Sequence, residues 1–414
     1  MRQVFLNCGT IAHMQNSLLE YTPSNENNIF PSGKAIVVNS SMIEQITESS
    51  EAEEEYAGTD EVQIINVEGR GIIPGFVDTH THLLWAGDRS QEVRFRNEGK
   101  SYAEIEQMGG GIALTTSLTR NASREQLIES GYVRLRTALS NGTTHIEAKS
   151  GYGLNVESEL KILECGHHLS QINHLPSIQQ TWLGAHSFPK ECSKEQYMDE
   201  LLSEQLPKVV DQGYAQSADV FCEPGWFSVE QSEEILKQSR ASGLRLRMHI
   251  DEFEHSGGAD LAADLNVDTA DHAYFTPLNS RIGMKEAQVN TGCLPGAPYV
   301  LGQKLHDYST LLEHEIPFTL ATDFNPNCQF LSLPLIGSLA VQRSGLHPLM
   351  ALKCVTSQAA QISILDKQHS NGTIQVGGKA TFNVLHSPYW ESWCQTPGHS
   401  PIHSTSLDGK YIVH

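Results

Sequence analysis

Short apolar runs alternate with longer amphipathic segments through the middle of the chain. Eight runs of strand length follow Gly71, and the segments between them repeat apolar residues at helical spacing. The predicted strands lie near Ile72–Val77, Thr143–Lys149, Ile178–Gly184, Asp219–Cys222, Arg245–His249, Asp268–Asp271, Val289–Leu294 and Phe318–Thr322. Strands separated by helical segments are typical of βαβ units in a parallel sheet. The pattern therefore predicts an α/β fold, a (β/α)8 TIM barrel over residues 71–362.

Both ends of the chain carry a different pattern, with short β-rich runs separated by turn residues. The expected strands include Val4–Leu6, Ala35–Val38, Thr373–Val376, Ala380–Leu385 and Tyr411–Val413. We expect residues 1–70 and 363–414 to pair into one small β-sandwich domain beside the barrel. The acidic run Glu51–Glu55 is expected to be a solvated loop, because like charges repel and stay hydrated.

Length and composition limit the domain organisation, the partners and the location that we expect for this protein. The 414 residues suffice for a barrel of roughly 250 residues and a smaller domain. A net charge of -21 disfavours nucleic acid and anionic membranes as partners, since both require basic surfaces. No apolar run approaches the length of a membrane span, and the N-terminus lacks the features of a signal peptide. Eight scattered cysteines without a Cys-x-x-Cys pair predict reduced thiols in a cytoplasmic protein.

The first predicted barrel strand ends in a pair of histidines. Its apolar run leads into Asp78-Thr-His80-Thr-His82. Side chains on a strand alternate between its two faces, so His80 and His82 point the same way. Two imidazoles on one face at a strand end can hold one metal ion.

Further polar residues follow the other predicted strands, at the end of the barrel where chemistry gathers. They are Glu147, Lys149, His186, Glu223, His249, Glu252, Asp271, His272, Asp323 and Asn325. A single histidine in such a place is more often an ordinary polar residue than a ligand. Ligand-type residues at the ends of the first, fifth, sixth and eighth strands together predict a metal site.

These residues resemble the amidohydrolase superfamily and, within it, the imidazolonepropionase family. The segments that carry the resemblance are Pro74-Gly-Phe-Val-Asp-Thr-His80-Thr-His82, His82-Leu-Leu-Trp-Ala-Gly-Asp-Arg89, Gly109-Gly-Gly-Ile, Lys149-Ser-Gly-Tyr152-Gly-Leu, Leu183-Gly-Ala-His186, Asp219-Val-Phe-Cys-Glu223, His249-x-Asp-Glu252, Ala270-Asp-His272 and Ala321-Thr-Asp323-Phe-Asn325-Pro. The resemblance extends over nearly the whole chain. It implies hydrolysis of 4-imidazolone-5-propanoate to N-formimidoyl-L-glutamate in histidine degradation, and a homodimer.

The resemblance also implies a set of site residues. One divalent metal ion, zinc or iron, would be held by His80, His82, His249 and Asp323. Contacts to a small substrate with a propionate tail carry over to Arg89, Tyr152, His186, Glu252 and Asn325. The family usually has glycine where this chain has Asn327. Asparagine tolerates glycine-like backbone angles better than most residues, so we keep Asn327 among the expected substrate contacts.

The chemistry of these residues suits opening of a cyclic amide. A metal can lower the pKa of bound water from about 15.7 to about 7, which makes hydroxide for the attack. Glu252 lies three residues after His249 and could carry the proton to the leaving ring nitrogen. Its alternatives are a supporting partner of the site's other groups or a surface carboxylate. His272 could hydrogen-bond the nucleophile or the oxyanion, or could be a fifth ligand.

Two cationic residues also leave alternatives open. Lys149 could bridge two metals as a carboxylated lysine. It lies at the end of the second strand, however, whereas the fourth strand, where such a lysine would be expected, ends in Glu223. We therefore favour one metal and a structural or supporting role for Lys149. Arg89 is the best candidate to clamp the propionate, because a guanidinium binds a carboxylate through two hydrogen bonds. Its alternative is a surface ion pair with Asp88 or Glu92. The Gly109–Gly111 run is expected to form a lid or turn rather than a phosphate cradle.

Two rival functions share most of this pattern. A cytosine- or guanine-deaminase-like enzyme would have the same metal ligands, but its substrates carry no propionate for Arg89. A non-catalytic scaffold of the same fold would tend to lose metal ligands, whereas this chain keeps the complete set.

Overall fold

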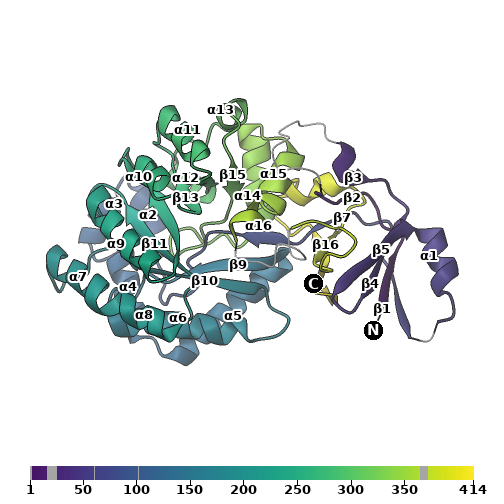
Figure 1. Cartoon of the computed structure of the whole chain (residues 1–414), viewed down its shortest axis with the longest axis horizontal. Coiled ribbons are helices and arrows are strands. Elements are labelled where there is room, and N and C mark those ends of the chain that lie inside the picture. The colour runs from purple at the N-terminus through teal and green to yellow at the C-terminus, as the bar shows by residue number, and fades with distance from the viewer. Residues whose placement is uncertain (1, 16–25, 60, 101, 364–371) are drawn as a thin grey trace.

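The computed structural model describes residues 2–15, 26–59, 61–100, 102–363 and 372–414. Figure 1 shows a helix-covered barrel on one side and a β-rich part that holds both chain ends on the other. Within the described residues, no helix is long and apolar enough to cross a bilayer.

The barrel is a sheet of eight strands whose neighbours in the sheet follow the order of the chain. Every neighbouring pair is parallel. The strands are β8 (Phe76–Asp78), β9 (Thr143–Lys149), β10 (Ser177–Ala185), β11 (Ser217–Cys222), β12 (Arg245–Ile250), β13 (Thr269–His272), β14 (Asn290–Cys293) and β15 (Phe318–Leu320). A parallel bridge between Thr81 and Phe324 joins the chain beyond β8 to the chain beyond β15. The predicted (β/α)8 barrel is confirmed.

Helices cover the outside of the barrel (Figure 1). They are α2 (Glu92–Asn97), α3 (Tyr102–Gln107), α4 (Gly111–Asn121), α5 (Arg124–Ser140), α6 (Val156–Ser170), α7 (Lys194–Glu200), α8 (Leu206–Gln212), α9 (Val229–Ala241), α10 (Gly258–Asp264), α11 (Leu278–Glu286), α12 (Gly296–Leu301), α13 (Tyr308–Glu313), α14 (Leu333–Ser338), α15 (Pro348–Cys354) and α16 (Ser357–Ile362). Ser-x-x-Gln at Ser123, Ser193 and Ser228 forms a capping box, which starts α5, α7 and α9. Apolar side chains such as Leu135 and Leu163 pack against Ile146 and form the main core.

The β-rich part consists of two sheets. The first sheet comes from the N-terminal segment and contains β5 (Met42–Glu48), β4 (Lys34–Asn39), β1 (Arg2–Leu6) and β6 (Val62–Asn66). The second sheet joins both chain ends and contains β18 (Lys410–Val413), β17 (Ile402–Leu407), β16 (Phe382–Leu385), β7 (Ile72–Pro74), β2 (Ile11–Ala12) and β3 (Ile29–Phe30). Phe5 and Ile36 from the first sheet share one buried cluster with Phe382 and Val384 from the second. Strands from both chain ends therefore build this part, as predicted.

The predicted strand Ile72–Val77 is two strands in two different sheets. It breaks at Gly75, so that β7 pairs with β16 and β8 pairs with β9. A Cβ atom on Gly75 would lie 2.4 Å from Thr144 Oγ1, and only glycine fits at this crossing.

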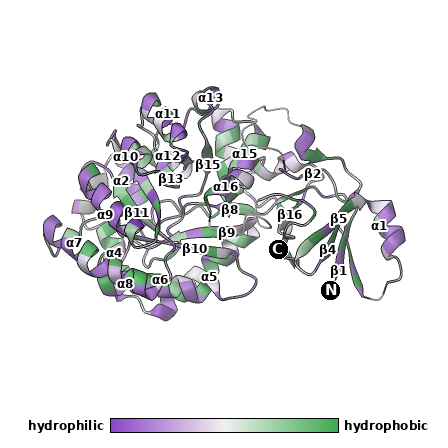
Figure 2. Ribbon diagram, in the orientation of Figure 1, coloured by the Kyte–Doolittle hydropathy of each residue, from purple (hydrophilic) through white to green (hydrophobic). Residues whose placement is uncertain are grey.

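The acidic run Glu51–Glu55 is not a loop, and that prediction was wrong. It lies in α1 (Ser49–Tyr56), where Ala52 and Tyr56 are buried one turn apart. These two side chains pack on Val4 and Val37 of the first sheet. The glutamates occupy the outer face, which is hydrophilic in Figure 2. Burial of the apolar stripe thus outweighs repulsion between exposed charges.

The predicted strand Thr373–Val376 is also absent, because residues 373–376 form no strand. This segment makes a backbone hydrogen bond from Ile374 N–H to the carbonyl of His13, at 2.9 Å. Ile374 is buried in the core between the two sheets, so its apolar character reflects packing rather than strand pairing.

Candidate metal and active site

The site lies where the first and last barrel strands meet. The Asp323 N–H donates to the His80 carbonyl at 3.0 Å, and the His82 N–H donates to the Phe324 carbonyl at 2.8 Å. These bonds fix both histidines beside Asp323. Asp323 and His272 have φ values of 50° and 69°, which non-glycine residues rarely adopt. Such strained backbone is concentrated at functional sites in proteins.

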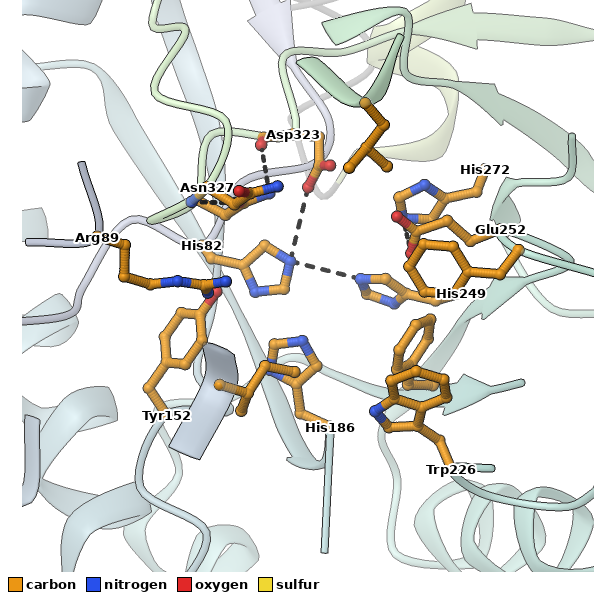
Figure 3. Close-up of a pocket in the computed structure, with 15 residues that line it drawn as sticks. His82, Arg89, Tyr152, His186, Trp226, His249, Glu252, His272, Asp323 and Asn327 are labelled. Atoms are coloured by element: carbon orange, nitrogen blue, oxygen red, sulfur yellow. Dashed lines mark hydrogen bonds and ion pairs between the residues drawn. The ribbon is translucent and has the colours of Figure 1, made fainter. Parts of the chain in front are cut away.

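The four expected metal ligands converge at this point. His80 Nε2 lies 3.6 Å from Asp323 Oδ1, and His82 Nε2 lies 3.8 Å from the same oxygen. His249, at the end of β12, has its Nε2 atom 3.4 Å from His82 Nε2 (Figure 3). Nitrogen ligands of one zinc ion are about 3.3 Å apart, since each lies about 2.0–2.1 Å from the metal. His272 also lies close enough to His80 and His249 to share an ion with them.

Two of the histidines form hydrogen bonds through Nδ1 that leave Nε2 available to bind a cation. His80 Nδ1 lies 2.6 Å from Asp271 Oδ2, and His249 Nδ1 lies 3.0 Å from Asp219 Oδ1. A carboxylate accepts hydrogen bonds, so each Nδ1 carries the proton and each Nε2 keeps a lone pair. Among the described residues, the buried Nε2 of His80 has no hydrogen-bond partner. Burial also holds the pKa of His80 and that of His82 well below the ordinary value, which keeps both rings neutral as metal ligands must be.

Lys149 contacts the carboxylate that positions His249. Its Nζ donates to Asp219 Oδ2 at 2.6 Å and to Glu147 Oε1 at 2.8 Å. Burial would lower the pKa of Lys149, but the two carboxylates raise it above its ordinary value, so the amine stays a cation. A charged amine between two carboxylates orients Asp219, and through it His249. Because a lysine must be neutral to be carboxylated, this charged state does not favour the metal-bridging alternative for Lys149.

We predict that Asp219→Asn weakens metal binding by about 10–100-fold, because His249 loses the charged group that fixes its ring. Metal affinity is measured by competition with a chelator. The control is Asp268→Asn, since Asp268 pairs with Arg245 at the start of the neighbouring strand, at 2.6 Å and away from the site. A change within twofold of the native affinity in Asp219→Asn would contradict the orienting role.

A pocket opens over the ligands (Figure 3). It is lined by His82, Arg89, Ile112, Tyr152, His186, Phe221, Trp226, His249, Glu252, Phe253, His272, Leu301, Asp323, Asn325 and Asn327. All the residues expected to contact substrate are in this set. His80 is not, because it lies beneath the pocket floor with its side chain 1% exposed.

Glu252 is held in place by a neighbouring carboxylate. The N–H groups of Glu252, Phe253 and Glu254 all donate to Glu223, each at 2.9 Å. The Glu252 Oε2 atom lies 3.7 Å from His272 Nε2. Burial and the charges of Asp323 and Glu223 raise the pKa of Glu252 well above its ordinary value. A raised pKa suits a group that takes up and returns a proton.

Arg89 forms a buried ion pair at the pocket wall. Its Nε and Nη2 atoms donate to the two oxygens of Glu92, each at 2.8 Å. Glu92 also accepts from the Gly111 N–H at 2.8 Å, so the glycine run starts α4 against this ion pair. The ion pair with Glu92 that the sequence offered as an alternative does form, but it is buried at the pocket wall rather than on the surface.

Tyr152 and His186 line the pocket beside His82. His186 Nδ1 donates to the Gly151 carbonyl at 2.9 Å, and its ring stacks on that of His82 with centroids 4.9 Å apart. Burial lowers the pKa of His186 to about 3, so the ring is neutral. Gly151 has a φ of 104°, and a Cβ atom there would lie 2.8 Å from His186 Nδ1. This turn therefore requires glycine.

The loop after β15 places the two asparagines. Asn325 Oδ1 accepts from the N–H groups of Asn327 and Cys328 at 2.8 and 3.0 Å, and Asn325 Nδ2 donates to the Asp323 carbonyl at 2.9 Å. Asn327 does not have a positive φ, so its position does not require a glycine-like backbone. Its Oδ1 instead accepts from Arg96 Nη1 at 2.5 Å.

The sequence did not reveal the individual roles of several of these residues. Asp271 was only one of the polar residues at strand ends, and Asp219 was not singled out, yet they hydrogen-bond the rings of His80 and His249. Alternation along their strands could have placed both aspartates inside the barrel. The aromatic wall of Phe221, Trp226 and Phe253 carried no sequence signal, because aromatic residues are common in any core.

Comparison with known proteins adds to this geometry. No family model matches the chain. A protein from Haloarcula marismortui named imidazolonepropionase is 37% identical over 354 residues, covering 86% of this chain and 84% of that protein. Another of the same name, from Geobacillus sp. (strain WCH70), is 34% identical over 407 residues, covering 98% and 95%.

The chain belongs to the imidazolonepropionase family. The crystal structure of 5-methylcytosine deaminase from Klebsiella pneumoniae matches the fold with a TM-score of 0.71, covering 99% of this chain and 97% of that one. At 14% sequence identity, this similarity shows a shared fold and carries no information about function. Sequence similarity thus favours the imidazolonepropionase family over the deaminase alternative.

Proposed function

We propose that this chain hydrolyses 4-imidazolone-5-propanoate to N-formimidoyl-L-glutamate, with one divalent ion, zinc or iron, held by His80, His82, His249 and Asp323. The observation that carries the proposal is the convergence of these four side chains at the floor of a pocket that is also lined by Glu252 and Arg89. A non-catalytic scaffold would tend to lose metal ligands, whereas this chain keeps the complete set.

The chain's own residues supply the proton transfers. When bound, the ion lowers the pKa of water and polarises the ring carbonyl. Glu252 accepts the proton of the attacking water and returns it to the ring nitrogen as the amide bond breaks. His272, 3.7 Å from Glu252, donates a hydrogen bond to the oxygen that becomes negative. The wall of Phe221, Trp226 and Phe253 limits bulk water around the reacting ring.

The remaining polar groups orient the substrate. Arg89 binds the propionate, held in position by Glu92. Tyr152 and His186 offer neutral contacts to the ring, on the side of the pocket near His82 (Figure 3). A fixed orientation of ring and tail places the amide carbon over the metal ligands.

The direct test is turnover of freshly made imidazolone propionate by the metal-loaded protein, with formation of N-formimidoyl-L-glutamate as the readout. Cytosine and guanine are tested in parallel for ammonia release. Ring opening without ammonia release from either nucleobase is the expected result. Ammonia release from a nucleobase, with no ring opening, would assign the site to the deaminase alternative.

We predict that Arg89→Ala raises KM by about a hundredfold with metal content unchanged, because a charge-assisted pair with the propionate is lost. The control is Arg94→Ala, whose side chain is 70% exposed. Steady-state kinetics and metal analysis check both variants. A native KM in Arg89→Ala would remove the propionate clamp from the proposal.

The thiols support a cytoplasmic location, which we propose on this basis. All eight cysteines are free, and all but Cys192 are buried. Free thiols persist in reducing compartments.

A further inference from the structure

Three charged side chains lie close together in α2 and in the turn before it. Arg89, Glu92 and Arg96 are spaced by three and four residues, which places them on one side of a helical turn. Glu92 is buried between the two arginines. It receives both hydrogen bonds of Arg89, and its Oε2 lies 3.9 Å from Arg96 Nη1.

The three charges of this group do not cancel, because the two arginines share the one carboxylate of Glu92. Glu92 neutralises Arg89, so that pair alone would offer a substrate carboxylate no net attraction and would place it beside a negative charge. Arg96 adds the second positive charge. Two arginines and one glutamate carry a net charge of +1, which the tail of an anionic substrate would neutralise.

Arg96 is also directed to the pocket by a specific partner. Its Nη1 donates to Asn327 Oδ1 at 2.5 Å, and Asn327 lines the pocket over the metal ligands. Arg89, Arg96 and Asn327 together line an adjoining cleft. The other charged residues that line this cleft are Lys100, Arg134 and Asp88, so basic side chains outnumber the acidic one. This cluster of basic side chains lies on a chain with a net charge of -21. A local positive potential on an acidic protein attracts anionic ligands to that place.

We propose that Arg96 is a specificity-determining residue, which supplies the net positive charge that selects substrates with a carboxylate tail, and that Asn327 holds its guanidinium at the pocket. The inference rests on the proposed function, because that function supplies the propionate. It also gives a reason for asparagine at position 327, since glycine would leave Arg96 without this hydrogen bond.

Three metal-loaded variants test the proposal. Arg96→Gln removes the charge but keeps a hydrogen-bond donor for Asn327, and Arg96→Lys keeps the charge. Arg94→Gln makes the same charge change on the same helix, at a side chain that points to solvent. Each variant is assayed for kcat and KM with imidazolone propionate. Each is also tested for binding of imidazole propionate and of its uncharged amide.

Arg96→Gln is expected to raise KM about tenfold with kcat within about twofold, the pattern for a group that binds ground state and transition state alike. The preference for the acid over the amide should fall by about the same factor. Arg96→Lys should recover part of both losses, and Arg94→Gln should behave as the native protein.

Two results would overturn the proposal. One is a native KM and a native acid preference in Arg96→Gln. The other is an equal loss of acid and amide binding with a lowered melting temperature, which indicates a structural role. If the native protein opens no imidazolone ring, the proposed function fails, and the comparison of acid with amide binding still decides whether Arg96 selects for a carboxylate.

Discussion

His249→Ala protein is expected to lose at least about a thousandfold in hydrolysis rate and to lose its metal ion on dialysis. The ring of His249 is buried, is fixed by Asp219 at 3.0 Å, and lies 3.4 Å from His82. Its removal leaves three ligand side chains and a void at the pocket floor. Metal analysis and turnover of imidazolone propionate measure the two losses.

The matched control is His255→Ala, a histidine six residues later whose side chain is 48% exposed. It should keep the native metal content and rate. Chelation of the native protein should remove activity, and zinc or ferrous iron should restore it. A His249→Ala protein that retains both its ion and a tenth of the native rate would show that the four side chains do not form the metal site.

Glu252→Gln protein is expected to lose about a thousandfold in kcat, within the range of about 10²–10⁴ for general acid–base groups. Metal content should stay native, because the side chain supports no ligand among the contacts described above. Glutamine has the same shape and can still donate a hydrogen bond, but it cannot take up the proton. Single-turnover rates separate this loss of chemistry from any change in substrate binding.

Glu254→Gln serves as the control for that variant. Glu254 is exposed, and its N–H donates to the same carboxylate of Glu223 at 2.9 Å. Its substitution tests whether any loss of charge in this loop lowers the rate. A Glu252→Gln protein with kcat within tenfold of the native value would assign proton transfer to another group, such as His272 at 3.7 Å.

The barrel could be predicted from sequence because its strands are buried on both faces. Strands such as β11 and β15 are buried at every position and are mostly apolar in sequence, so they stand out between the helical segments. The candidate ligand histidines could be named from the sequence because they lie at the ends of those strands. The resemblance to a known family then selected the expected ligand set among them.

Other features depend on contacts that local sequence does not contain. Asp271 lies 191 positions from the His80 ring that it orients. The break at Gly75 is required by Thr144, which belongs to the next strand. The helix of the acidic run depends on a sheet surface built by β1 and β4. In each case the deciding partner lies elsewhere in the chain, and a reading of neighbouring residues cannot identify it.

The meeting of the first and last barrel strands has a mechanical consequence. The backbone bonds of His80 and His82 to Asp323 and Phe324 close the ring of strands, and three of those residues are also proposed ligands. A cation bound here would crosslink the first and last barrel strands. Loss of the ion would then weaken the barrel first where these two strands meet, and the geometry of the active site would be lost at the same time.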